Sequence, residues 1–225
     1  MTPSSQPSQP SATGRPRQFD DERVIDAALE LFWQKGFRNT TTRDLESVSG
    51  LTSSSLYNAF GSKHEIFAQA LMRYQRRITT TLVGPLEEST LGLEALDQFF
   101  ASLESWIQRE GRRGCLLVNM MAEDGGTTNE LTKIARHYRV RMTQAFSATL
   151  HRAVSLGELP ASDVTSRAAL LVAQVLGINL AARAGAGSTE LRDLIGSTRD
   201  QISRWQSYTA PAHCDREIPG KHENE

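Results

Sequence analysis

Residues 41 to 60 read TTRDLESVSGLTSSSLYNAF, and this stretch decides the fold of the N-terminal part of the chain. Thr41 stands three residues before Asp44, which is the spacing of a capping box at a helix start. Gly50 accepts the left-handed backbone that ends a helix, and Thr52 can cap a second one. Two short helices joined by a tight, glycine-containing turn are typical of a helix-turn-helix. We expect four apolar side chains to meet beneath the turn: Leu45, Val48, Leu51 and Leu56.

Helical periodicity continues on both sides of this segment. Upstream, apolar residues from Val24 to Phe32 share one helix face, and Gly36 is expected to end that helix. Downstream, Ser62 and Glu65 form a second capping-box pair before a long apolar stripe. Further stripes of the same period continue to about residue 208, and no convincing strand pattern is found. The sequence therefore predicts an all-α fold of about nine helices.

The composition is that of an ordinary soluble globular protein. The 225 residues are 39% hydrophobic and 23% charged, with a net charge of −1. Residues 1 to 80 contain ten basic and eight acidic side chains, a net charge of +2, so the electrostatic signature of nucleic-acid binding is weak. Two cysteines, Cys115 and Cys214, are too few for a disulfide framework. We therefore expect a reducing compartment and a cytoplasmic protein.

The two ends of the chain differ from its middle. Residues 1 to 18 are rich in Ser, Pro and Gln and contain no apolar run, so we expect a disordered N-terminal arm and no signal peptide. Residues 209 to 225 are expected to form a disordered tail. The longest apolar stretch, Ala168 to Ala182, is shorter than the roughly 20 residues needed to span a bilayer. No membrane partner is expected.

The second short helix of the 41–60 segment carries polar side chains that suit DNA. Small or planar polar groups can enter a major groove and contact base edges or phosphates. Lys63 begins the following helix, where a positive charge beside free backbone N–H groups can hold a phosphate. The alternative is an all-α ligand-carrier or interaction protein in which the helix-turn-helix is purely structural. The polar residues concerned are Ser53, Ser54, Tyr57 and Asn58.

The whole pattern resembles the DNA-binding domain of TetR-family transcriptional regulators. The matching residues are Gly36-Phe37, Thr40-Thr41-Thr42, Asp44-Leu45, Gly50-Leu51, Leu56-Tyr57, Phe60, Ser62-Lys63 and Ile66. Glu46 departs from the alanine that most members carry there. A subgroup of the family has Leu-Glu at this point, and the runs SLYNAFGSK (55–63) and GCLLVN (114–119) resemble that subgroup.

The resemblance implies an architecture and a partner. Residues 19 to 80 would form a three-helix DNA-binding domain, with its helix-turn-helix at 41–60, and residues 81 to 208 a helical ligand-binding and dimerisation domain. A homodimer joined through the last two helices, about 163–208, would bind a palindromic double-stranded DNA operator. An unknown small-molecule, electrophile or oxidant inducer would release this repressor. The implied DNA-binding residues are Thr42, Arg43, Ser53, Ser54, Tyr57, Asn58 and Lys63.

Three further groups of residues are candidate sites. Arg15 and Arg17 would form a minor-groove arm or a solubilising tail. Cys115 follows two arginines at an expected helix start, which would lower its pKa and suit a sensor of oxidants or electrophiles. A buried small hydrophobe is the alternative. Aromatic and methionine side chains of the second domain would line a ligand pocket or belong to the core: Phe99, Phe100, Trp106, Met120, Met121 and Tyr138.

The sequence shows no catalytic or metal-binding motif. HExxH, CxxC, GxSxG and phosphate-loop spacings do not occur, and the five histidines are scattered. A dyad of Cys115 and His137 is conceivable in three dimensions, but no spacing favours it. We expect no enzyme activity, no metal site and no cofactor.

Overall fold

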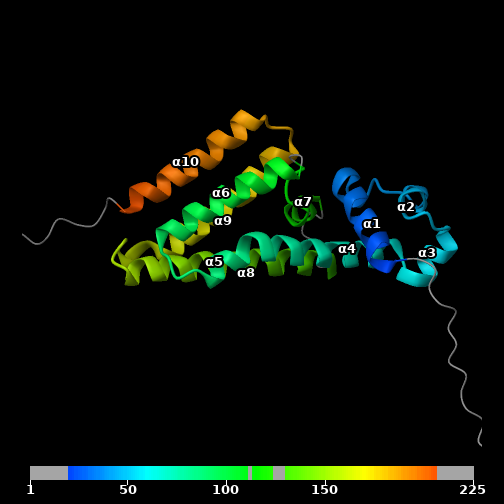
Figure 1. Ribbon diagram of the computed structural model, residues 1–225, viewed down its shortest axis with the longest axis horizontal. Helices are drawn as coiled ribbons and strands as arrows, with labels where there is room; N and C mark the ends of the chain where they lie inside the picture. The colour runs from blue at the N-terminus through cyan, green and yellow to red at the C-terminus, as the bar shows by residue number, and fades with distance from the viewer. Residues whose placement is uncertain (1–19, 111–112, 124–129, 207–225) are drawn as a thin grey trace, which may run out of the picture.

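The computed structural model describes residues 20–110, 113–123 and 130–206, and these ranges contain helices and no strand. The all-α prediction is confirmed (Figure 1). The described ranges hold ten α-helices, one more than the nine expected, and the additional one is a short helix after residue 83. They are α1 (Asp21–Lys35), α2 (Thr42–Ser49), α3 (Ser53–Phe60), α4 (Lys63–Ile78), α5 (Gly84–Glu88), α6 (Leu93–Arg109), α7 (Leu116–Glu123), α8 (Glu130–Ser155), α9 (Val164–Arg183) and α10 (Ser188–Gln206).

The first three helices and the start of α4 form a head at one end of the molecule (Figure 1). Beneath the turn between α2 and α3, Leu45 and Leu56 are each 1% exposed, and Leu51 packs partly buried against them and the rest of the core. The expectation for Val48 is wrong, because its side chain is 41% exposed. Val48 lines an open cleft between the head and the end of α6.

The predicted helix starts and stops of the head are confirmed. Capping boxes are present at Thr41 before α2 and at Ser62 before α4. The Thr52 hydroxyl caps α3 by accepting the Ser55 N–H at 3.3 Å. Gly50 ends α2 with φ at 68°, in the left-handed region that costs a side-chain-bearing residue free energy. Local side-chain chemistry therefore sets the lengths of these short helices.

The chain passes from the head to the larger helical body without leaving the helical state. α4 runs directly into a π-helical turn, Thr79–Val83, and this turn runs into α5. The domain boundary expected near residue 80 falls inside this continuous run. Because π-helical turns are rare and locally widen the helix, this one marks an irregular point in the connection.

The body is built around α8, which packs against α4, α5, α6, α7 and α9. α10 lies mainly on α6. Phe99 and Phe100 of α6 meet Phe146 of α8 at ring-centroid distances of 5.0 and 6.3 Å. These rings are at most 3% exposed, so they form the centre of the body's core.

Helix α9 is apolar on nearly all sides. Its inner face is buried against α8 and includes Leu171 and Val175, whereas Leu170 and Leu180 are 38% and 52% exposed. The segment Ala161–Arg183 is long and apolar enough to cross a membrane by length and composition alone, so the length argument drawn from the sequence is wrong. The core helix of a soluble protein passes the same test, and one side of α9 is packed as such a helix.

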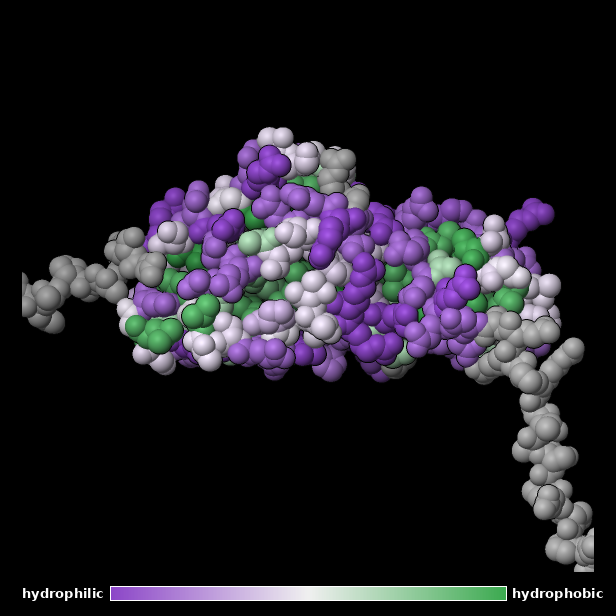
Figure 2. Space-filling model, viewed as in Figure 1, coloured by the Kyte–Doolittle hydropathy of each residue, from purple (hydrophilic) through white to green (hydrophobic). Residues whose placement is uncertain are grey.

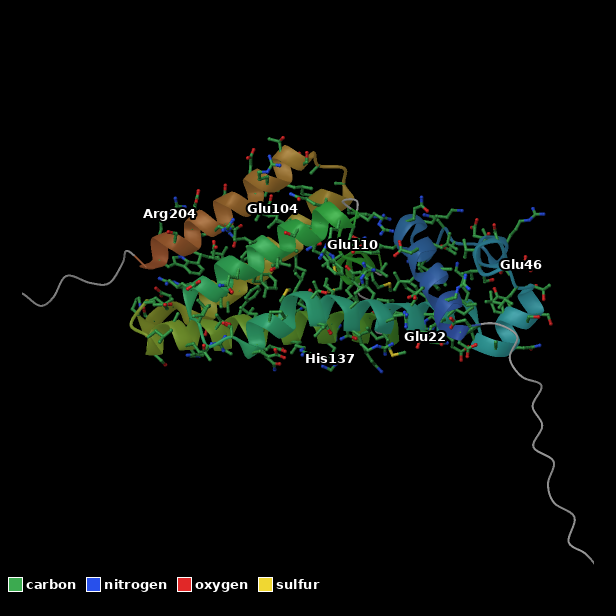
Figure 3. The ribbon with its side chains drawn as sticks, viewed as in Figure 1. Glu22, Glu46, Glu104, Glu110, His137 and Arg204 are labelled. Atoms are coloured by element: carbon green, nitrogen blue, oxygen red, sulfur yellow. The ribbon has the colours of Figure 1, made fainter. Side chains whose placement is uncertain are left out.

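Hydrophilic residues gather over the middle of the molecule, where the head meets the body (Figure 2). Ion pairs connect the two parts there. Arg113, which precedes α7, pairs with Glu30 of α1 at 2.6 Å, and it also lies 3.5 Å from Glu110. Glu110, at the end of α6, pairs in addition with Arg77 of α4 (Figure 3). The junction is therefore held in part by charged side chains.

Candidate DNA-binding interface

Helices α2 and α3 are joined by a side-chain contact that the sequence alone did not reveal. The Glu46 carboxylate of α2 (Figure 3) accepts a hydrogen bond from the backbone N–H of Ser53, the first residue of α3, at 2.6 Å. The first N–H groups of a helix lack intrahelical partners, and the helix dipole favours a negative charge beside them. Glu46, the departure from the common family pattern, therefore ties the two helices together.

Tyr57 of α3 is held by Thr42 of α2. The Tyr57 hydroxyl and Thr42 Oγ1 are 2.7 Å apart and share a hydrogen bond. The Tyr57 ring is partly buried and packs against the core of the head. A hydroxyl that makes one hydrogen bond keeps further donor or acceptor capacity. The structure thus fixes the ring and leaves the hydroxyl able to contact a base edge or a phosphate.

Three of the other predicted contact residues are exposed. Arg43 of α2 is exposed and forms no ion pair with a described residue, so its guanidinium is not occupied by the acids of its own helix. Ser54 and Asn58 of α3 are also exposed. Ser53 differs, because it is partly buried and its N–H is taken by Glu46. Only the Ser53 hydroxyl is left for a partner.

Lys63 lies at the start of α4 with its Nζ 4.6 Å from the centre of the Phe37 ring. Partial burial lowers the pKa of Lys63. The Ser62 carbonyl accepts the first backbone hydrogen bond of α4. The N–H groups of Lys63 and His64 therefore have no acceptor within the helix. This geometry suits a phosphate, which takes both backbone donors and a positive charge.

One acidic group of α2, Asp44, has its charge paired with a lysine. Asp44 closes the capping box of α2 and pairs with Lys35 at 2.6 Å. The hydrogen bond from Lys35, followed by those from Thr41, lowers the pKa of Asp44 to about 2. The carboxylate therefore stays ionised and paired, and it adds little repulsion toward a phosphate backbone.

The predicted contact residues come from three elements that lie together at the outer end of the head: α2, α3 and the start of α4 (Figure 1). An α-helix with an exposed polar side fits a major groove, and the flanking elements then meet the backbone. Arg15 and Arg17, the predicted minor-groove arm, lie outside the described residues.

Two family profiles match this chain. The profile described as "Bacterial regulatory proteins, tetR family" matches residues 24–70, and "Tetracyclin repressor-like, C-terminal domain" matches residues 92–197. The HTH-type transcriptional repressor ComR of Escherichia coli strain K12 is 30% identical over 191 residues, which cover 82% of this chain and 90% of ComR. The chain belongs to the TetR family. It is a DNA-binding transcriptional regulator and not an enzyme, and members of the family act as dimers.

Solved TetR-family structures have the same fold. A cysteine-substituted form of the regulator CifR, in complex with 26-base-pair operator DNA, aligns with a TM-score of 0.71 and 23% identity, covering 85% of this chain and all of CifR. A TetR regulator from Chloroflexus aurantiacus aligns with a TM-score of 0.73 and 21% identity over 81% of this chain and 93% of its own. The predicted arrangement of an N-terminal helix-turn-helix and a C-terminal helical domain is confirmed.

The expectation of a lowered pKa at Cys115 is wrong. The side chain is 1% exposed, and this burial raises the pKa of its thiol. The nearby Tyr74 hydroxyl and the first N–H groups of α7 favour the thiolate without offsetting the burial. Arg113 does not stabilise the Cys115 thiolate, because its guanidinium lies over the Trp33 ring and pairs with acidic side chains. The role of Cys115 as a sensor of oxidants or electrophiles stays a prediction.

The predicted pocket residues lie in the core of the body. Phe99, Trp106, Met120 and Tyr138 are at most 5% exposed, and Met121 is partly buried. The Phe99 ring meets its neighbour Phe100 edge-on at 5.3 Å. This packing agrees with the core alternative, and a role in ligand binding stays a prediction.

Cys115 and the histidine considered as its partner lie in different environments. His137 is exposed on α8 (Figure 3), whereas Cys115 is buried. Within the described ranges, no group of three or more His, Cys, Asp or Glu side chains could hold a metal ion.

Proposed function

We propose that this TetR-family chain is a repressor that binds a near-palindromic double-stranded DNA operator with α3 in the major groove. The observation that carries the proposal is the Tyr57–Thr42 hydrogen bond beside exposed Arg43, Ser54 and Asn58. It places a rigid aromatic residue among polar groups that are free to contact DNA. Repression, rather than activation, is supported by the similarity to the repressor ComR.

The contact residues divide into two roles in this proposal. Arg43 and Asn58 read base edges, because a guanidinium suits guanine and a carboxamide suits adenine. Lys63, together with the N–H groups at the start of α4, holds a phosphate and so positions the head without reading sequence. Thr42, Tyr57 and the two serines contact either group through their hydroxyls.

Dimerisation is proposed to use the outer face of α9. This face exposes Leu170 and Leu180 together with small residues, so a second copy can approach closely and cover it. Most of the apolar stripe of α10 is already used within one protomer, because Leu191 and Ile195 are at most 3% exposed. From α10, the other helix expected at the interface, we retain Leu194, which is 40% exposed.

The inducer is proposed to bind inside the body, in the cytoplasm, at Phe99, Trp106, Met120, Met121 and Tyr138. The indole N–H of Trp106 is buried and has no hydrogen-bond partner among the described residues. Such a donor would be satisfied by an acceptor atom of a ligand. An electrophile or oxidant acting at Cys115 is the alternative route, and it requires access to a thiol that is buried here.

The experiment is a fluorescence-anisotropy titration of the full-length protein with the duplex upstream of its own gene. A shuffled duplex of the same composition is the control. We expect tight, salt-dependent binding to the first duplex and much weaker binding to the second. Tyr57→Phe removes only the hydroxyl and should weaken operator binding while the fold is kept. Equal binding to both duplexes would exclude sequence-specific recognition.

A second experiment tests the interface. Leu180→Arg places a charge on the outer face of α9, and light scattering should show a monomer. Leu156→Arg is the matched control, because Leu156 is 57% exposed and follows the end of α8 instead of belonging to α9. Monomers from both variants, or from neither, would contradict the assignment of α9.

A further inference from the structure

We infer that Arg183 is a positioning residue for DNA binding, which anchors the head to the dimerisation helix through the end of α1. The inference rests on the proposed operator binding and on the proposed role of α9. It adds a further connection between head and body, beside the ion pairs at the junction and the continuous helix that leads from α4 to α5.

The anchoring contact joins two helix ends that are 150 residues apart in sequence. Arg183, the last residue of α9, donates from Nη1 to the carbonyl oxygens of Trp33 at 3.3 Å and Gln34 at 3.5 Å. The last carbonyls of a helix have no intrahelical donor, and the negative end of the helix dipole lies there. A guanidinium at this place supplies both the missing donor and the favourable charge.

The Trp33 side chain also helps to hold the C-terminal end of α1 in place. Its side chain is fully buried, and its indole N–H donates to the Gly114 carbonyl at 3.0 Å. The Arg113 guanidinium lies 4.0 Å from the centre of the ring and pairs with Glu30 of α1. The end of α1 is thus held by the segment before α7 as well as by α9.

Gly114 brings these elements together. Its φ of +70° favours glycine, and a Cβ there would lie 2.5 Å from the Asn179 carbonyl oxygen of α9 and 3.2 Å from the Arg183 Cβ. The backbone at Gly114 therefore passes directly between Trp33 and α9. We call the group of Trp33, Arg113, Gly114 and Arg183 the Trp33 anchor.

The anchor has a geometrical consequence for the dimer. A head attached only through α4 could swing at the irregular π-helical turn, Thr79–Val83. An open cleft of about 590 Å³ between α1, α2 and the end of α6 leaves room for that movement. A second attachment at the end of α1 fixes the angle. Because it ends on α9, it also sets the separation of the two heads across the proposed interface.

The test is Arg183→Met, which keeps an unbranched apolar stem and removes every donor. Arg167→Met is the matched control, since Arg167 lies on the same helix but contacts Asp163 and Trp205. Anisotropy is measured on the operator, on duplexes with two base pairs added or removed between the half-sites, and on a single half-site. Thermal melting and light scattering confirm that both variants are folded dimers.

In the wild-type protein a change of spacing should lower affinity strongly, because rigid heads fit one spacing. Arg183→Met should bind the native operator about tenfold less tightly, within the usual range of coupling between sites, and should lose most of its spacing preference. Its half-site affinity should be unchanged. A uniform loss on all duplexes, or an unaltered spacing preference, would overturn the inference.

A measurement without DNA separates this inference from the proposed function. Spin labels are placed at the exposed residue 47 of α2 through Ser47→Cys, in a chain that also carries Cys214→Ser. Buried Cys115 remains unlabelled in the native state. The distance distribution between the two heads should be narrow in the wild-type background and broad in Arg183→Met. Identical distributions in the two proteins would contradict the role of the Trp33 anchor. If the distributions differ but the operator titration fails, only the proposed function is contradicted.

Discussion

Removal of the Glu46 carboxylate tests whether the α2–α3 contact positions the recognition helix. Glu46→Ala deletes the acceptor that lies 2.6 Å from the Ser53 N–H, while Thr52 continues to cap the Ser55 N–H. One of two side-chain caps on α3 is lost. A lost N-terminal cap costs about 1 kcal/mol. For a chain of this size we expect the melting temperature to fall by about 2–4 °C.

The effect on DNA binding has two parts of opposite sign. Deleting a negative charge beside the phosphate backbone strengthens binding to every duplex. Loss of the fixed α2–α3 angle weakens operator binding alone, and about 1 kcal/mol corresponds to about a fivefold loss in the operator-to-shuffled affinity ratio. Glu46→Gln separates the two parts, because the amide removes the charge but keeps an acceptor oxygen.

Anisotropy titrations on operator and shuffled duplexes at several salt concentrations give the ratio for each variant. Both variants should bind the shuffled duplex more tightly than the wild type. Only Glu46→Ala should show a lower operator-to-shuffled affinity ratio and a lower melting temperature. If Glu46→Gln and Glu46→Ala behave alike in both measurements, the hydrogen bond to Ser53 does not position α3.

Three further predictions follow from the same geometry. Lys63→Ala should weaken binding to all duplexes and reduce its salt dependence, whereas Asn58→Ala should change which bases are preferred; equal losses on operator and shuffled duplexes for both would contradict the division of roles. Cys115 should react slowly with a thiol reagent at pH 8 in the native protein and rapidly in urea, because it is buried with a raised pKa; fast native labelling would disprove that burial. Asp44 has its pKa lowered from 3.8 to about 2, chiefly by Lys35, so its stabilising contribution is present above pH 4 and is lost as the pH falls toward 2. Urea unfolding should therefore show a steeper acid loss of stability in the wild type than in Asp44→Asn, and parallel curves would count against the pairing.

Much of the DNA-binding head could be predicted from residues 41 to 66. Capping boxes, a glycine in the left-handed region and the helical spacing of apolar residues all act within a few positions along the chain, so their outcome is local. The starts of α2 and α4 and the end of α2 at Gly50 followed this logic. The exposure of Val48 did not, because a helix of two turns has more than one side that can be apolar.

The role of each candidate residue depended on contacts between distant segments. Arginines adjacent to Cys115 suggested a reactive thiolate, but Arg113 turns to Trp33 and Glu30, and the thiol is buried in the body. The last two helices were expected to meet a partner, but Leu191 and Ile195 of α10 are already buried within one protomer, where α10 packs mainly on α6. Periodicity identifies an apolar face and cannot name the surface that covers it.

The sequence by itself determined that this chain is helical, where the short helices of its head begin and end, and which family it resembles. These properties follow from short-range backbone chemistry and from residues at fixed spacing. Tertiary structure alone decided that Glu46 caps α3, that Cys115 is buried, and that Arg183 meets the end of α1 across 150 residues. The physical reason is that such contacts depend on the packing angles of whole helices, which many side chains set together.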